Sequence, residues 1–251
     1  MGIVLSRKLG KLPPKFDART LQLRRYLPPV ELPAAPPSVD YAARVPAWGV
    51  MANDRVGDCT CAACGHMVME WTANSRRGIV PSDAAVLRMY SAVTGYDPAT
   101  GANDNGATCI DVLNYWRRHG LSRHKILAYA QAPPGDTMHV KQALYLFEGL
   151  YLGLAMPLSA KKQKIWAKPA GGWRGDGEPG SWGGHAVPAI AYDADCVSVI
   201  TWGYVQKMSW AFFHRCVDES YACVSRDMLK AGRCPLGFDL PTLMRDLQEI
   251  V

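Results

Sequence analysis

The chain has 251 residues, of which 49% are hydrophobic and 20% are charged. This length and composition suffice for a sizeable core, in one large domain or two tightly joined lobes, and exclude a disordered protein. No apolar run approaches the ~18 residues that span a bilayer, and residues 1–15 lack the apolar segment of a secretory signal peptide. We therefore expect no membrane span and a cytoplasmic or virion-associated protein.

The net charge of +6 is concentrated at the N-terminus. Residues 1–26 hold seven basic side chains and one acid, Asp17, so this segment alone carries 7 − 1 = +6. The first 45 residues are also rich in proline, which favours extended structure. We predict an extended, solvated arm over residues 1–37; the alternative is an arm that docks on an acidic partner or a larger assembly. Nothing resembles a nucleic-acid-binding module, so a nucleic-acid partner is not expected.

Residues 38–149 have the periodicity of helices. Apolar side chains spaced three to four apart predict a helix that begins at Cys59. Ser82 is positioned to cap a second helix, and Thr108, with Asp111 three residues later, to cap a third. A fourth helix is predicted over residues 137–149.

Residues 150–251 have the pattern of a sheet. Strands are predicted at 150–156, 185–192, 196–203, 208–216 and 221–225. Residues 193–195 have turn composition, residues 171–184 form a glycine-rich loop, and Pro188 predicts a bulge or an edge in its strand. The expected architecture is α+β, with a mainly helical lobe (38–149), a mainly β lobe (150–251) and a cleft between them.

The stretch NDRVGDCTCAACGHMVMEW, residues 53–71, places three of the eight cysteines within six positions. A structural zinc site needs four convergent ligands. Cys61, Cys64 and the neighbouring His66 would all lie on one helix, and no second pair of ligands with short spacing follows. We therefore predict no metal and no cofactor.

Two other interpretations of the cysteines remain. Disulfides are less typical of a large, apolar, unsecreted chain, in which most thiols are small buried hydrophobes. The third interpretation is a nucleophile: Gly57 and Asp58 form a turn, and Cys59 occupies the first helical position, where the helix dipole stabilises a thiolate. Such a thiolate needs a histidine from elsewhere, and His185, after two glycines and before an apolar strand, is the candidate.

These segments together resemble the papain-like cysteine peptidase family. The matching features are Val39-Asp40-Tyr41, Asn53 thirteen residues after Asp40, Cys59 six residues further on at a helix start, and a distant His185 followed by Trp202-Gly203 on the next strand. The likeness extends over about residues 38–225. It implies a two-lobed papain-like fold with the histidine on the sheet lobe.

The resemblance also implies a mechanism and a set of site residues. Cys59 would be the nucleophile and His185 its base, with Asn53 and the Cys59 backbone N–H forming an oxyanion hole. Trp202 would shield the histidine's hydrogen bond, and we place Gly57, Asp58, Gly184 and Trp202 on the substrate-binding side. The family has an asparagine where this chain has Ile200, which cannot orient an imidazole. Thr201, one position later, is predicted to take that role.

Three functional hypotheses follow. The leading one is a cysteine hydrolase that cleaves amide bonds of a peptide or protein substrate through an acyl-enzyme. The second is another acyl transfer on the same Cys–His pair: deamidation, transglutamination or cleavage of a peptidoglycan amide. The third is a catalytically weakened papain-like domain with a structural or docking role, for example in a phage virion, which the Ile200 departure and the basic arm favour.

Overall fold

The computed structural model describes residues 7–15, 20–26, 34–228 and 240–249. Cys234 and the remaining parts of the arm, residues 1–6, 16–19 and 27–33, lie outside the described residues. The α-helices are α1 (Cys59–Asn74), α2 (Asp83–Thr94), α3 (Cys109–Arg118), α4 (Thr137–Phe147), α5 (Trp210–Cys216) and α6 (Leu240–Glu249). Short 3-10 turns lie at Leu23–Arg25, Leu158–Lys162 and Gly175–Gly177.

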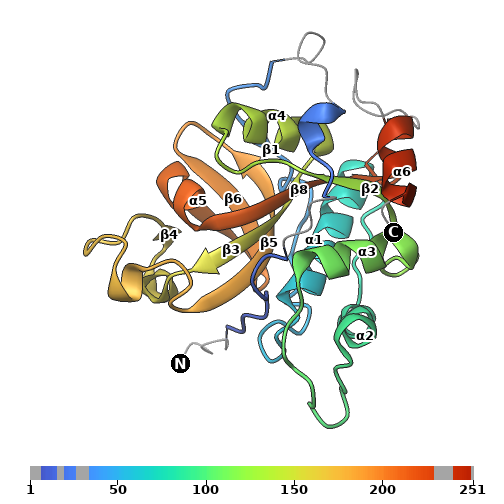
Figure 1. The fold of residues 1–251 in the computed structure, drawn as a ribbon, viewed down its shortest axis with the longest axis horizontal. Helices are drawn as coiled ribbons and strands as arrows, with labels where there is room; N and C mark the ends of the chain where they lie inside the picture. The colour runs from blue at the N-terminus through green and yellow to red at the C-terminus, as the bar shows by residue number, and fades with distance from the viewer. Residues whose placement is uncertain (1–6, 16–19, 27–33, 229–239, 250–251) are drawn as a thin grey trace.

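The strands form one sheet with the order β2-β8-β3-β5-β6-β7-β4, and β1 pairs with β5. Their bounds are β1 (Val39–Asp40), β2 (Ile126–Gln131), β3 (Leu150–Met156), β4 (Ile165–Trp166), β5 (Gly183–Tyr192), β6 (Cys196–Thr201), β7 (Tyr204–Ser209) and β8 (Val217–Ser225). All pairs are antiparallel except β4 with β7. In Figure 1 the sheet lies on one side of the molecule and α1, α2 and α3 on the other, which agrees with the α+β prediction.

The predicted helix starts are confirmed. The Ser82 side chain accepts a hydrogen bond from the Ala85 backbone N–H, and Thr108 accepts one from Asp111 N–H. Each cap satisfies one of the N–H groups that a helix start leaves without a partner.

The predicted strand over residues 208–216 is wrong beyond its first two residues, because residues 210–216 form a helix. The strand ends at Ser209, whose hydroxyl accepts from the Phe212 N–H and begins α5. Serine capping thus overrides the β propensity of the aromatic residues that follow. Strand β2 was not predicted. Pro188 does not mark an edge, because β5 lies between β3 and β6, but the β5–β6 register shifts between Ala189 and Ala191.

Helix α1 is the centre of the molecule. Fourteen of its sixteen residues are buried, and it packs against β5 across the junction of the two halves. A helix that is buried on all sides needs no polar face, which explains the density of Cys, Ala and Met in its sequence. The first residue of α1, Cys59, therefore lies where the helical half meets the sheet.

The arm is hydrogen-bonded to the rest of the domain over residues 8–12, although the Lys8 and Leu12 side chains are exposed. Figure 1 shows the dark blue segment passing between the helical half and β5. Lys8 N–H donates to Asn53 O, both Gly10 and Lys11 N–H groups donate to Gly184 O, and Leu12 N–H donates to Ala107 O. The expectation of a solvated arm is therefore wrong for residues 9–11, and also for the buried side chains of Leu21, Leu23 and Tyr26.

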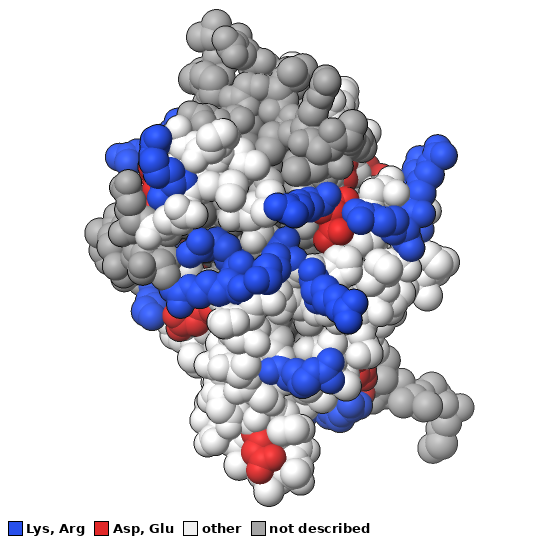
Figure 2. Space-filling model, turned by 90° about the vertical axis from the view of Figure 1, so that its right-hand side faces the viewer, with Lys and Arg blue, Asp and Glu red and all other residues white. Residues whose placement is uncertain are grey.

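The other charges are unevenly distributed over the surface. Figure 2 shows a face on which Lys and Arg side chains gather with few acids among them. The elements on this side of Figure 1, namely α2, α3 and α6, contribute Arg88, Arg118 and Arg245, all of them exposed.

None of the described helices combines the length and apolar character needed to cross a bilayer.

Candidate active site

Cys59 begins α1, directly after the Asp58 N-cap residue. Its Sγ accepts a hydrogen bond from the backbone N–H of Ala186 at 3.4 Å. Ala186 is the neighbour of His185 on β5, so the first turn of α1 brings Cys59 next to the histidine-bearing strand. The two residues are 126 positions apart in sequence, and the α1–β5 packing brings them together.

The His185 ring is held on two sides. Its Nε2 atom lies 2.6 Å from the hydroxyl oxygen of Thr201 on β6. The Trp202 ring stacks on the imidazole with 4.5 Å between centroids and 13° between planes. The remaining nitrogen, Nδ1, is buried and has no hydrogen-bond partner among the described residues. When Thr201 accepts the Nε2 proton, Nδ1 is the basic nitrogen and is free to act on a neighbouring group.

Ile200 and Thr201 face opposite sides of the sheet. Ile200 is fully buried in a small apolar cluster with Ile190 and Ala191, whereas Thr201 reaches His185. Successive side chains of a strand alternate between faces, so only one of these two residues can contact the imidazole. The hydroxyl contact that we predicted for Thr201 is present in the structure.

Both members of the pair are deeply buried. Cys59 is 1% exposed, and burial raises the pKa of its thiol to about 12, although the Ala186 N–H contact opposes the shift. Burial lowers the pKa of His185 to about 3. These shifts favour the neutral thiol and the neutral imidazole, because a low-dielectric environment disfavours both charged forms. The thiolate–imidazolium pair is therefore disfavoured in this conformation.

The arm contacts Cys59 and contributes to its burial. Gly10 N–H is a second backbone donor whose contact lowers the pKa of Cys59, so the arm runs directly over the sulfur. A Cβ added at Gly10 would overlap the carbonyl group of Gly57, and one added at Gly184 would overlap that of Lys11. The arm thus approaches the chain so closely at these two points that only glycine fits, and it lies against Cys59.

Several solved structures share the fold of this chain. Xylellain, a cysteine protease from Xylella fastidiosa, superposes with a TM-score of 0.61 at 15% identity, over 89% of this chain and 99% of that one. A procathepsin B from Trypanosoma congolense gives 0.57 at 14% identity, over 88% and 87% of the two chains. Bromelain from Ananas comosus gives 0.52 at 14%, over 75% and 99%. The fold is papain-like.

No family model and no curated protein matches the sequence. At 14–15% identity, the likeness to the three named structures concerns the fold.

The Asn53 side chain, which we expected to form part of an oxyanion hole, is hydrogen-bonded within its own turn in this structure. Its side-chain Nδ2 donates to the carbonyl oxygen of Val56, 3.1 Å away, within the turn that leads to Cys59. Asp58 is also fully buried, and burial raises the pKa of its carboxyl group well above the usual value, with Asn53 acting in the opposite direction. In this conformation the Asn53 amide supports the turn, while neither Asp58 carboxyl oxygen has a hydrogen-bond partner in the described part of the chain.

Asp104 is a site residue that the sequence did not single out from ordinary turn residues. Its Oδ1 accepts hydrogen bonds from Gly57 N–H and from the Tyr90 hydroxyl, both at 2.9 Å. The Tyr90 oxygen in turn accepts from Gly106 N–H at 2.8 Å. One carboxylate thus ties the turn before Cys59 to the loop before α3. Asp104 lies 45 positions from Cys59, and no sequence motif connects the two residues.

The remaining cysteines are packing residues in this structure. Cys61, Cys64, Cys109 and Cys223 are buried, and all seven cysteines of the described segments are free thiols. Within those segments no three His, Cys, Asp or Glu side chains gather as metal ligands do. His66 bonds the carbonyl oxygen of Gly49 at 2.7 Å and is structural.

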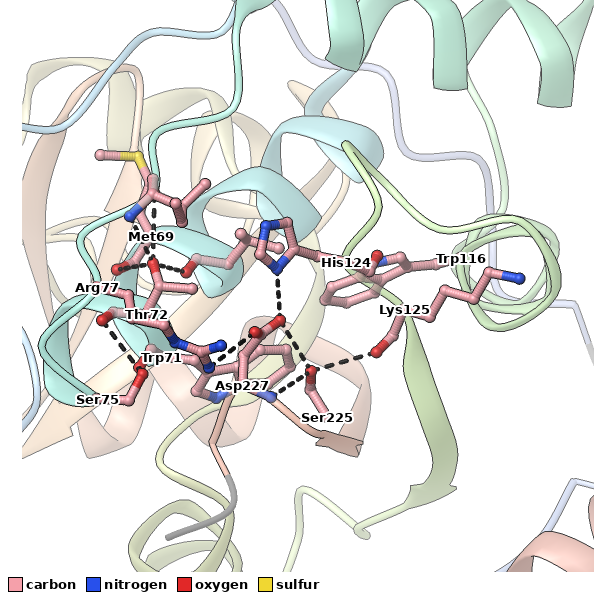
Figure 3. Close-up of polar contacts among 12 residues, drawn as sticks. Met69, Trp71, Thr72, Ser75, Arg77, Trp116, His124, Lys125, Ser225 and Asp227 are labelled. Atoms are coloured by element: carbon pink, nitrogen blue, oxygen red, sulfur yellow. Dashed lines mark hydrogen bonds and ion pairs between the residues drawn. The ribbon is translucent and has the colours of Figure 1, made fainter. Parts of the chain in front are cut away.

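A second polar cluster joins the end of β8 to the loop before β2 and to the turn after α1 (Figure 3). Asp227 accepts from Arg77 at 3.1 Å and pairs with Nδ1 of His124 at 2.6 Å, and Ser225 Oγ lies 3.3 Å from the same carboxylate. The hydroxyl and the imidazole both contact the acid rather than each other, so no nucleophile–base pair forms. This cluster holds the chain together and is not a second active site.

Proposed function

We propose that this chain is a cysteine peptidase in which Cys59 is the nucleophile, His185 the general base and acid, and Thr201 the residue that orients the imidazole. The observation that carries the proposal is the His185 ring, whose Nε2 is bonded to Thr201 while Nδ1 is unpaired beside the strand position that contacts Cys59. The papain-like fold supports it, because proteins of that fold include the cysteine proteases named above.

The reaction needs both nitrogens of His185. Nδ1 takes the proton of the Cys59 thiol, and the resulting thiolate adds to the carbonyl carbon of the scissile bond. The imidazolium then gives its proton to the leaving amine, and the C–N bond breaks to leave a thioester. Water attacks the thioester after transferring a proton to Nδ1, the carboxylic acid leaves, and the thiol reforms. Throughout, the Thr201 oxygen fixes the ring by accepting a hydrogen bond from Nε2–H, which keeps its proton.

The arm makes this enzyme latent. Residues 8–12 cover Cys59, and their burial of the thiol and the imidazole opposes the ion pair that attack requires. Displacement of the arm lets water reach the cleft, which lowers the cost of charging both groups. The oxyanion role of Asn53 belongs to this open form, in which its amide is free to turn from Val56 toward the cleft.

The other two hypotheses predict different outcomes. Deamidation, transglutamination or peptidoglycan-amide cleavage would use the same Cys–His pair but spare peptide bonds. A docking module would lack a reactive Cys59. The contact between Thr201 and His185 weighs against the docking module, because a chain without a catalytic imidazole gains little by orienting one.

The test uses the full chain with the arm displaced by Gly10→Val, since a side chain at this position overlaps the Gly57 carbonyl. Hydrolysis of a mixed fluorogenic peptide library and of unfolded casein is followed, with new termini identified by mass spectrometry. Peptide cleavage by Gly10→Val that disappears in Gly10→Val/Cys59→Ala is the expected result. Glutamine deamidation without any new terminus would instead support the second hypothesis.

Gly171→Val is the matched control, because a Cβ at Gly171 meets no atom within 4 Å. It should be as inactive as the wild-type chain. If the Gly10→Val protein, folded by circular dichroism, leaves every peptide intact, the peptidase proposal is wrong.

A further inference from the structure

The Lys11 side chain fills a closed pocket beside the candidate active site. Its Nζ lies 2.9 Å from Asp218 Oδ2 and 3.2 Å from Glu219 Oε1. The lysine side chain is only 1% exposed, although a lysine is almost never buried without partners. Burial alone would lower the pKa of Lys11, but Asp218 and Glu219 outweigh it and the pKa is raised.

A β-bulge shapes the acidic end of this pocket. The β3–β8 register pairs Gly153 with Glu219 and Leu154 with Val217, so Asp218 is an extra residue in β8. In a regular strand consecutive side chains point to opposite faces, and a bulge removes that alternation. The irregularity therefore allows two successive carboxylates to reach the same ammonium group.

The floor of the pocket depends on Gly153. A Cβ at this position would overlap Lys11 Cε and would lie 2.5 Å from Glu219 Cγ. Glycine weakens the interior of a strand, so its presence in the centre of β3 leaves space at a cost in strand stability. The extended Lys11 side chain occupies this space, with its ammonium group at the carboxylates.

The buried end of the pocket favours a cation. The Glu219 side chain is 2% exposed, and the Tyr221 hydroxyl donates to its Oε2 at 2.8 Å. Its Oε1 lies 3.2 Å from Lys11 Nζ and has no hydrogen-bond partner in the described part of the chain. Removing one partner of a buried ion pair leaves an uncompensated charge, which is strongly unfavourable. When the arm leaves, the Glu219 carboxylate loses its ion pair with Lys11 and would be stabilised by another positively charged side chain in the pocket.

The backbone around Lys11 is held as an extended peptide would be. Ala107 N–H donates to Gly10 O at 2.8 Å, and Ala107 O accepts from Leu12 N–H at 3.0 Å. Gly184 O accepts from Gly10 and Lys11. When a peptide adds to an exposed backbone edge, main-chain bonds supply affinity and side-chain pockets supply sequence preference. These edges flank Cys59 and become available to any extended peptide once the arm is displaced.

We propose that the pocket formed by Gly153, Asp218 and Glu219 is a specificity subsite for a lysine or arginine side chain of the peptide substrate, and that Lys11 occupies it as an internal mimic. The inference rests on the proposed peptidase function and names its substrate class: peptides with a basic residue at one fixed position near the cleaved bond. Asp218, 27% exposed, meets the mouth of the pocket, and Glu219 its interior.

The first test is cleavage. The Gly10→Val chain is assayed with a positional library in which each residue around the cleaved bond is in turn lysine, arginine, norleucine or glutamate. Norleucine keeps the apolar chain of lysine and lacks its charge. At one position we expect lysine or arginine to be preferred over norleucine by at least about tenfold. In Gly10→Val/Asp218→Asn/Glu219→Gln that ratio should fall to near one. If peptides are cleaved, absence of a basic preference at every position, or a ratio unchanged by the double substitution, overturns the subsite.

The second test is independent of catalysis. A fluorescent synthetic peptide of residues 7–15 is titrated into the full-length Gly10→Val/Cys59→Ala chain, and compared with the same peptide carrying norleucine at position 11. We expect the lysine peptide to bind at least about tenfold more tightly. Equal affinity contradicts the subsite even if peptides are cleaved. Loss of cleavage with a retained difference in affinity would overturn the peptidase function and leave the subsite standing. Lys11→Glu, which sets a third carboxylate in the pocket, is a second arm-displacing variant if Gly10→Val folds poorly.

Discussion

The hydroxyl oxygen of Thr201 lies 2.6 Å from Nε2 of His185, and the Trp202 ring covers the same imidazole. Thr201 follows Ile200, the position at which the papain-like family has its asparagine. Because successive side chains of β6 alternate between faces, Thr201 lies on the face of His185 and Ile200 does not. A threonine oxygen can accept a hydrogen bond from a ring N–H as an amide oxygen does. The hydroxyl is therefore sufficient to favour the tautomer with the proton on Nε2.

Thr201→Val removes this hydroxyl while keeping the side-chain shape. In the Gly10→Val background we expect kcat for peptide cleavage to fall about ten- to hundredfold, because the imidazole loses its orientation. Thr201→Ser should recover most of the loss. The pH profile of kcat separates this role from a packing role, since only an effect on the imidazole displaces the acidic limb. An unchanged profile in Thr201→Val would show that Thr201 does not position the base.

Displacement of the arm should convert Cys59 from an inert thiol to a reactive one. In the wild-type chain the pKa of Cys59 is raised to about 12, so iodoacetamide should label it poorly at pH 6–8. In Gly10→Val we expect labelling near pH 7 at a rate at least about tenfold higher, mapped by peptide mass spectrometry. Gly171→Val should behave as wild type. Equal rates in the wild-type and Gly10→Val chains would contradict the covering role of the arm.

Asp104 should contribute to both stability and site geometry. Asp104→Ala leaves Gly57 N–H and the Tyr90 hydroxyl without their acceptor, and we expect a loss of about 1–3 kcal/mol in the free energy of unfolding. Asp104→Asn keeps an oxygen in the same place and should cost much less. Urea denaturation of the three proteins measures the difference. Equal losses in the two variants would assign the effect to the charge rather than to the acceptor.

His66 should make the protein less stable in acid. Burial lowers its pKa to about 4, so the folded state keeps the ring neutral while the unfolded state protonates it near pH 6.5. The stabilising contribution is complete above pH 6.5 and is lost as the pH falls toward 4. His66→Gln removes this titration. Between pH 7 and pH 4.5 the unfolding free energy of wild type should decrease by about 2 kcal/mol more than that of the variant.

The difference between the two proteins is the quantity to measure, because Asp58 and Glu70 shift in the opposite sense and partly mask the histidine in either protein alone. Parallel pH dependences in wild type and His66→Gln would contradict a neutral buried His66.

The sequence by itself determined the local features of this protein. The caps at Ser82 and Thr108 fixed the starts of α2 and α3, because capping involves residues three apart. The spacing from Asp40 through Asn53 to Cys59, with a distant His185, was sufficient to predict a papain-like fold. Strand β2 and helix α5 were not predicted. Whether a segment forms a strand depends on its packing against neighbouring strands, which a local sequence pattern does not reveal.

Tertiary structure alone decided the contacts between distant segments. The arm has the composition of a solvated tail, yet residues 8–12 pack over Cys59, because glycine at positions 10 and 184 permits backbone contact that no local pattern reveals. Asp104 and Glu219 acquire their roles from loops and a bulge that bring them to Gly57 and Lys11. Local propensity acts over a few residues, whereas these relationships depend on chain packing across 40 to 210 positions, and only the folded molecule specifies that packing.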